Sequence, residues 1–138
     1  MKVSTKGRYA LRMLVDLAKH QGEGHVALKD IAARQHISKK YLEQIVPLLH
    51  SSEMLQASRG FQGGYRLARD PKEYTVASIL RLTEGDIAPV VCLECGQHGC
   101  DFKDQCPTFT MWEGLYNLMS NYLEGITLQD LVDNRVKN

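Results

Sequence analysis

The sequence predicts a mainly α-helical chain with one small β-hairpin and a long helix near its C-terminal end. Three observations support this fold class. Several segments repeat apolar residues at helical spacing, a glycine-rich loop near residue 60 separates two short strand-like segments, and a broad apolar stripe follows residue 107. The 138 residues suit one compact domain with an additional helix or two.

A first helix is predicted from Ser4 or Thr5, either of which can cap its N-terminus, to about residue 20. Its apolar residues recur at helical spacing, so one face is expected to be buried. The other face is expected to be exposed and carries Arg8, Arg12, Asp16 and Lys19. Residues 21–24 end this helix, and residues 25–27 can form a short edge strand.

Two further helices follow, joined by a tight turn at residues 36–37. The first covers residues 28–35, and the second runs from the N-cap residue Ser38 to about residue 51. Because the second helix opens with a capping serine and two lysines, the pair matches a helix-turn-helix. Pro47 lies inside this helix, where a proline removes a backbone hydrogen bond, so a bend or an early last turn is expected.

A β-hairpin follows these helices. Residues 55–58 and 65–68 are predicted strands, and the glycine-rich loop 59–64 joins them. A helix-turn-helix followed by such a hairpin is a winged helix-turn-helix, in which the hairpin is the wing. A fourth helix is predicted to begin after the cap residue Thr75 and to end at Glu84.

The last long helix is predicted from about Pro107 to Glu124. Its apolar stripe comprises Trp112, Leu115, Tyr116, Met119, Tyr122 and Leu123, and Phe109, Met111 and Leu118 widen it. Because this stripe is broad for a small core, we expect part of it to pack on a second copy of the chain. Thr127 opens a short final helix with a capping box. The predicted regions are a DNA-binding winged helix (1–85), a cluster-binding loop (86–107) and a dimerisation region (108–138).

All four cysteines lie within residues 92–106, here called the cysteine segment: Cys92, Cys95, Cys100 and Cys106, spaced Cys-x2-Cys-x4-Cys-x5-Cys. The chain shows no signal peptide and no membrane span, so we expect a cytoplasmic protein whose clustered thiols bind metal. The spacing alone leaves an iron–sulfur cluster and zinc equally open. A thiol–disulfide switch between Cys92 and Cys95 is a third interpretation, and His98 is a weak candidate ligand.

Charge is divided unequally along the chain. Residues 1–70 carry 12 Lys and Arg against 6 Asp and Glu, whereas residues 71–138 carry 5 against 10. A basic half indicates a polyanionic partner. The candidate DNA contacts are Arg8, Ser38, Lys39, Lys40, Tyr41, Glu43, Arg59, Gly60, Gly63 and Gly64.

Several of these residues have simpler interpretations. Glu43 can accept a hydrogen bond from cytosine or pair with a lysine one turn earlier, and both are equally open. Tyr41 and Tyr65 fit the core better than a DNA contact. The glycines can serve the tight turn of the hairpin alone. No catalytic motif occurs, so an enzyme is not expected.

Four blocks carry a resemblance to a known family: residues 4–11, residues 41–44, Ser58-Arg59-Gly60 and Gly63-Gly64-Tyr65. They resemble the Rrf2 family of bacterial winged-helix transcription regulators, and the resemblance extends from residue 1 to about residue 132. It implies a homodimer that binds double-stranded operator DNA, for example as a repressor, with a winged helix on each subunit. It also implies a long crossing helix at the dimer interface.

The family includes iron–sulfur regulators of the IscR type, nitric-oxide sensors of the NsrR type and cysteine-metabolism regulators of the CymR type. Cys92, Cys100 and Cys106 match the three cysteine ligands of cluster-binding members, so the resemblance favours a 2Fe-2S or 4Fe-4S cluster over zinc. Phe109 replaces the histidine ligand of IscR-type chains, so the candidates for the fourth ligand are Cys95, then His98, then a small molecule or water.

The resemblance thus implies DNA binding controlled by a cluster that senses iron–sulfur status, redox state or nitric oxide. One alternative is a CymR-type regulator controlled by a partner metabolic enzyme. The other is a zinc-stabilised or thiol-switched regulator.

Overall fold

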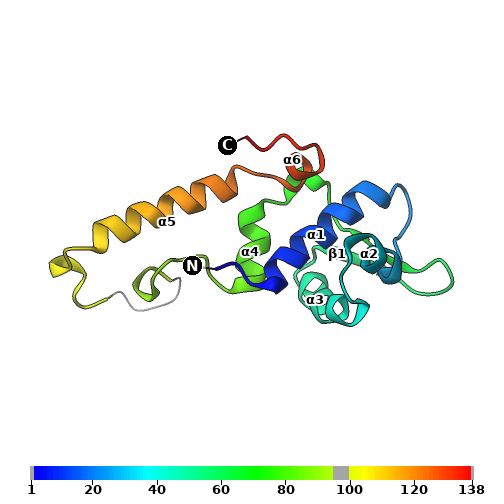
Figure 1. The fold of residues 1–138 in the computed structure, drawn as a ribbon, viewed down its shortest axis with the longest axis horizontal. Coiled ribbons are helices and arrows are strands. Elements are labelled where there is room, and N and C mark those ends of the chain that lie inside the picture. Colours follow the sequence, from blue (N-terminus) through cyan, green and yellow to red (C-terminus); the bar gives the residue numbers. More distant parts are fainter. Residues whose placement is uncertain (1, 95–99, 138) are drawn as a thin grey trace.

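The computed structural model describes residues 2–94 and 100–137 and confirms the predicted class, a mainly helical chain with one β-hairpin (Figure 1). The helices are α1 (Thr5–His20), α2 (Leu28–Gln35), α3 (Lys39–Ser51), α4 (Val76–Glu84), α5 (Phe109–Glu124) and α6 (Leu128–Val132), and the strands are β1 (Leu55–Ser58) and β2 (Gly64–Leu67). Single-turn 3-10 helices cover Pro71–Glu73, Val91–Leu93 and Lys103–Gln105. No helix in the described part of the chain is long and apolar enough to cross a membrane.

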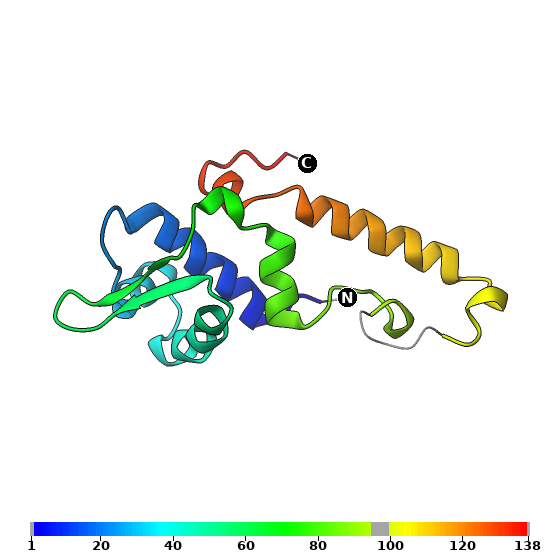
Figure 2. The ribbon, with the colours of Figure 1, turned by 180° about the vertical axis from the view of Figure 1, so that it is seen from behind.

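Helix α1 lies at the centre of the fold and contacts α2, α3, β2, α4 and α6 (Figures 1 and 2). Its apolar face packs into the core, as the helical spacing predicted: Ala10, Leu14 and Leu17 are fully buried, and Leu11, Val15 and Ala18 are partly buried. This face joins side chains from every neighbouring element in one hydrophobic core, which includes Ala10, Met13, Leu14, Leu17, Ile31, Leu42, Ile45, Leu49, Leu55, Leu67, Ile79 and Leu128. Burial of side chains of this size contributes about 1.5–3 kcal/mol each, so packing against α1 stabilises each of these elements.

The helix-turn-helix has the predicted bounds. His36 adopts a left-handed conformation (φ 53°) in the turn, and the Ser38 hydroxyl accepts a hydrogen bond from the backbone N–H of Tyr41 (3.0 Å). Helix α3 continues past Pro47 to Ser51, its predicted end, so of the two expected effects of Pro47 the early last turn does not occur, and a bend stays a prediction. The reason is tertiary, because buried side chains on both sides of Pro47 hold the segment against the core.

The hairpin pairs antiparallel, with Leu55 opposite Leu67 and Ser58 opposite Gly64, so β2 begins one residue earlier than predicted. The predicted edge strand at residues 25–27 is reduced to a single bridge between Val26 and Tyr65. This bridge requires glycine at position 64, since a Cβ atom there would lie 2.2 Å from the carbonyl oxygen of Val26. The wing is therefore attached to the segment that follows α1.

The chain returns to the core at α6. Thr127 forms the predicted capping box with Asp130, and Leu128 is fully buried. The backbone N–H of Leu128 donates to the Tyr74 carbonyl oxygen (2.9 Å), and that of Val76 donates to Ile126 (2.9 Å). The Tyr74 hydroxyl in turn donates to the Met54 carbonyl oxygen (2.7 Å) at the base of the wing.

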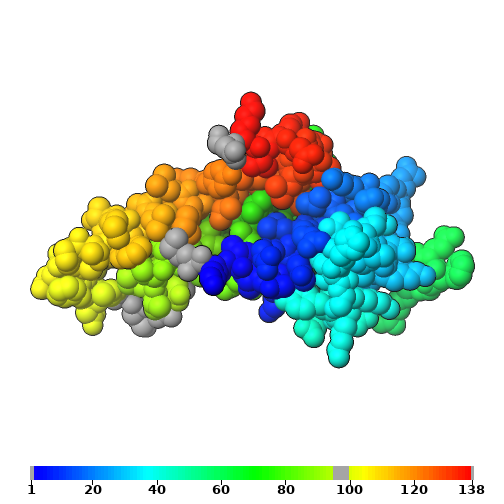
Figure 3. Space-filling view, viewed as in Figure 1, coloured from blue at the N-terminus to red at the C-terminus, as the bar shows by residue number. Residues whose placement is uncertain are grey.

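Helix α5 differs from the other long helices because none of its residues is buried. It extends along one side of the molecule, at the end opposite the wing (Figures 1 and 2), and residues 100–124 form a projecting arm in the space-filling view (Figure 3). An amphipathic helix with so little burial has an incompletely covered apolar face.

Candidate functional site

The first turn of α3 presents Ser38, Lys39 and Lys40 to solvent. Their side chains can reach DNA phosphates without giving up buried contacts. Lys39 Nζ lies 3.8 Å from Glu43 Oε1, so the simpler interpretation of Glu43 as an ion-pair partner has a structural basis. Both side chains are more than half exposed (59% and 54%), and such a pair contributes at most about 1 kcal/mol. A base contact by Glu43 stays a prediction.

Tyr41 points from the same turn toward α1. Its ring meets the ring of Tyr9 edge-on, with the centroids 5.3 Å apart, and the Arg12 guanidinium lies 5.3 Å from the Tyr9 centroid. Tyr41 and Tyr65 are half-buried and pack against the core. These contacts attach α3, the second helix of the helix-turn-helix, to α1. A contact between Tyr41 and DNA stays a prediction.

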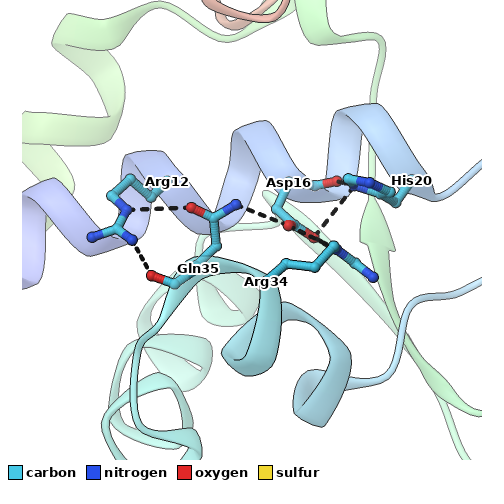
Figure 4. A network of polar contacts seen from close by, with 5 residues as sticks. All are labelled: Arg12, Asp16, His20, Arg34 and Gln35. Carbon is cyan, nitrogen blue, oxygen red and sulfur yellow. Dashed lines mark hydrogen bonds and ion pairs between the residues drawn. The ribbon is translucent and has the colours of Figure 1, made fainter.

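A polar network holds α2 against α1 (Figure 4). Asp16 was expected on the exposed face of α1, but it is only 1% exposed, so that expectation is wrong. Arg34 at the end of α2 donates to both carboxylate oxygens of Asp16 (2.7 and 3.0 Å), and Gln35 Nε2 donates to Oδ2 (2.9 Å). Arg12 donates to the side chain and the carbonyl oxygen of Gln35.

This network explains how a carboxylate is tolerated inside the fold. Burial alone would raise the pKa of Asp16, but the hydrogen bonds from Arg34 and Gln35 outweigh burial and lower it below its ordinary value. His20 Nδ1 lies 3.6 Å from the same carboxylate. Because Arg34 and Gln35 directly precede the turn, the network sets the orientation of the helix-turn-helix relative to α1. The sequence carried no signal for it, since Asp16 and Arg34 are 18 residues apart.

The wing ends in an exposed loop, residues 59–63. Gly63 donates a backbone hydrogen bond to Gly60 (3.0 Å), and Gly60 has φ 105°. A Cβ atom at Gly63 would lie 2.4 Å from the Ser58 carbonyl oxygen, so the tight turn itself requires glycine there. Arg59 is exposed at this loop and also lines a hollow between the wing and the second half of α3, beside Pro47 and His50.

The cysteine segment follows α4. Cys92 lies half-buried in the 3-10 helix Val91–Leu93, Cys100 is exposed, and Cys106 is half-buried just after the 3-10 helix Lys103–Gln105. All three are free thiols. The candidate fourth ligands Cys95 and His98 lie outside the described residues. Within residues 2–94 and 100–137, no three metal-ligating side chains converge on one point.

The chemistry of these three thiols fits a soft metal. The Thr108 hydroxyl lies 3.4 Å from Cys106 Sγ and lowers the pKa of this thiol, which favours the thiolate. Phe109 offers no ligand atom, and its ring lies 4.9 Å from Lys103 Nζ. Cys92, Cys100 and Cys106 therefore supply the donor type that iron–sulfur clusters and zinc use.

The predicted dimer stripe divides between two environments. Trp112, Leu115, Tyr116, Met119 and Leu123 are half-buried, whereas Tyr122 is 55% exposed. Met111 and Leu118 beside them are 56% and 72% exposed. Residues 111, 115, 118 and 122 recur at spacings of four, three and four, so they form one apolar strip, which we call the free face of α5.

A cavity of about 480 Å³ lies where these parts meet. Its walls come from the N-terminal segment, the end of α4, the connector to the cysteine segment and α5: they include Val3, Leu80, Glu84, Ile87, Met119 and Tyr122. Glu84 also accepts two hydrogen bonds from Ser4 at the start of α1. No sequence pattern predicted the contact between Ser4 and Glu84, because the two residues are 80 positions apart in the chain.

The helix-turn-helix, the basic start of α3 and the exposed wing define a winged-helix regulator of transcription rather than an enzyme. The chain belongs to the Rrf2 family, described as "Iron-dependent Transcriptional regulator", whose sequence profile matches residues 3–134. The "HTH-type transcriptional regulator IscR" of Serratia proteamaculans (strain 568) is 38% identical, over 98% of this chain and 81% of that protein. The predicted family is thus confirmed.

Two solved structures extend the comparison. T. potens IscR is 38% identical, with a TM-score of 0.77 over 99% of this chain and 89% of that one. CymR (YrzC), described as the global cysteine regulator of B. subtilis, is 35% identical, with a TM-score of 0.75 over 97% of this chain and 98% of that one.

Proposed function

We propose that this chain is a cytoplasmic, homodimeric regulator whose affinity for operator DNA is controlled by an iron–sulfur cluster on Cys92, Cys100 and Cys106. The observation that carries the proposal is a set of three free thiols in one short segment of a chain whose family is described as iron-dependent. Cysteine thiolates are the usual ligands of such clusters. When bound, the cluster would supply iron whose state responds to iron supply, oxidants or nitric oxide.

The fourth ligand is proposed to be Cys95, then His98, then a small molecule. The chain's own part is to bring three thiolates together, which orders the cysteine segment. Residues 85–91 join that segment to α4 and residues 107–108 join it to α5, and Arg81 of α4 forms an ion pair with Glu124 of α5. An ordered segment therefore holds these two helices in one arrangement.

The dimer contact is proposed to use the free face of α5, formed by Met111, Leu115, Leu118 and Tyr122. The exposure of Met111, Leu118 and Tyr122 in the single chain supports this, since an interface would remove these adjacent apolar side chains from water. In a two-fold dimer the recognition helices must match half-sites about 34 Å, or a multiple of that, apart. The arrangement of α4 and α5 would set this distance and thereby the affinity for DNA.

The test is to purify the protein without oxygen and measure its visible spectrum, its iron and its acid-labile sulfide. We expect iron and sulfide in comparable amounts, and their loss from the variant with Cys92, Cys100 and Cys106 all replaced by Ala. The matched control is Asp101→Ala, which alters an exposed residue of the same segment. Protein without iron, whose DNA affinity is the same after the triple replacement, would refute the proposal.

A second candidate is a cysteine-metabolism regulator controlled by a partner enzyme. The likeness to the B. subtilis CymR structure favours it. This candidate predicts DNA binding that is unchanged by the triple replacement and altered by an added enzyme of cysteine metabolism. A zinc-stabilised regulator, the third candidate, would be colourless when purified without oxygen and would contain one zinc per chain.

A further inference from the structure

One aromatic side chain at the tip of the wing is fully exposed. Phe61 is 103% exposed, that is, as accessible as in an extended peptide. Of the large apolar side chains exposed in the described part of the chain, the others lie near the chain ends, in or directly before the cysteine segment, or on α5: Val3, Val91, Phe102, Met111, Leu118, Tyr122 and Val136. Phe61 alone lies in the wing, at the opposite end of the molecule from α5 (Figures 1 and 2).

The loop geometry holds this side chain away from the fold. The hydrogen bond from Gly63 to Gly60 closes the loop tightly, so the residues between them form a narrow tip. Arg59 and Gln62 line a hollow at the base of the wing together with His25, but Phe61 does not. The side chain of Phe61 is thus fully accessible to an external ligand, and Arg59, two residues earlier in the same loop, is exposed as well.

We propose, on the basis of the DNA-binding function, that Phe61 is a minor-groove contact. Its ring enters the groove beside the Arg59 guanidinium and packs against deoxyribose and base edges. Arginine is attracted to narrow minor grooves, and apolar side chains are inserted there by many DNA-binding proteins. The narrow groove suits a slim loop tip, whereas phosphates would offer a phenyl ring no favourable contact.

The contact also implies a base preference. In the minor groove, only G·C pairs carry an amino group, on guanine N2, and this group would obstruct the ring. We therefore expect A·T pairs where the wing meets DNA. Inosine·cytosine pairs should be accepted equally well, because inosine lacks that amino group. Arg59 is also attracted to the narrow minor groove of A·T-rich DNA, so the contribution of Phe61 is the part of the preference that is lost in Phe61→Ala.

The first experiment uses a duplex of about 30 base pairs selected from random sequence by the unaltered full-length protein. Phe61→Ala should weaken binding about tenfold without changing the slope of log Kd against log salt, because no phosphate contact is lost. Phe61→Leu should keep most of the affinity. Gln62→Ala, the matched control in the same loop, should change the affinity less than threefold, and all three should melt at the temperature of the unaltered protein.

The second experiment replaces the A·T pairs that the wing protects in a footprint by G·C or by I·C pairs. The unaltered protein should lose affinity for the G·C duplex only, and this loss should be clearly smaller in Phe61→Ala, which keeps only the preference of Arg59 for a narrow groove. If Phe61→Ala binds as tightly as the unaltered protein, or if Gln62→Ala is equally weakened, the inference is wrong while DNA binding stands. If the unaltered protein selects no duplex, the DNA-binding function fails as well.

Discussion

The backbone N–H and the hydroxyl group of Ser4 both donate to the same carboxylate oxygen of Glu84, at 3.0 and 2.6 Å. The Ser4 hydroxyl oxygen also accepts from the backbone N–H of Gly7 (3.1 Å), so Glu84 stabilises the cap of α1. A Cβ atom at Gly7 would lie 2.3 Å from that carboxylate oxygen, so the close approach depends on glycine. The contact between Ser4 and Glu84 thus connects the end of α4 to the first turns of α1, where Arg8 lies. The end of α4 leads in turn to the cysteine segment.

Glu84→Ala should lower the free energy of unfolding by about 1–3 kcal/mol, because two hydrogen bonds to a charged group are lost. It should also weaken DNA binding, because the turn that presents Arg8 loses its support. Urea unfolding and DNA titration measure the two effects. Glu84→Gln keeps an acceptor oxygen and should restore most of both, whereas Glu23→Ala, in an exposed turn, is the control that should leave both unchanged. Equal loss in the Gln and Ala variants would contradict this prediction.

Asp16→Asn should destabilise the protein by about 2–3 kcal/mol at pH 7, because Arg34 and Gln35 lose their common acceptor. The lowered pKa of Asp16 also predicts a pH dependence. A carboxyl group with a depressed native pKa stabilises the fold above its unfolded pKa of about 3.9, and that contribution is lost as the pH falls through the native pKa.

The unaltered protein should therefore lose more stability than Asp16→Asn between pH 5 and the acid range. Urea unfolding at a series of pH values measures the difference, and Asp101→Asn, at an exposed position, is the control. Parallel pH profiles for the unaltered protein and Asp16→Asn would show that the network has no such role.

Arg59→Ala and Lys40→Ala should each weaken operator binding and reduce the salt slope by about one, because each removes one cation from the phosphate backbone or the groove. Fluorescence anisotropy at several salt concentrations measures both quantities. Lys72→Ala removes an equally exposed lysine from the 3-10 helix Pro71–Glu73 and should change neither. An unchanged affinity in both test variants would show that neither Arg59 of the wing nor Lys40 of α3 contacts DNA.

Leu118→Glu should convert the dimer to a monomer, because it places a charge on the free face of α5, where the native side chain is 72% exposed. Light scattering after size exclusion measures the mass. Asn117→Glu places the same charge on the polar side of the helix and should leave the dimer intact. If Leu118→Glu keeps the dimer mass, the free face of α5 is not the interface.

The sequence alone located the helices and the hairpin and identified the family, because these depend on short stretches of neighbouring residues. Ser38, Thr75 and Thr127 cap the helices that they were predicted to cap, since a cap needs only the next three residues. The apolar spacing located the buried face of α1, and the four conspicuous blocks identified the family. The cysteine spacing predicted metal ligation by thiolates, with a thiol–disulfide switch as the alternative.

Tertiary structure alone decided which polar residues are buried and which apolar residues remain free. Asp16 is buried because Arg34 and Gln35 of another helix donate hydrogen bonds to it. Glu84 supports the cap residue Ser4, which lies 80 residues earlier in the chain. Leu118 stays exposed because no element in the described part of the chain covers that side of α5. Such contacts join residues that are distant in the chain. Helical periodicity reports only which residues share a face, so it cannot reveal what that face meets.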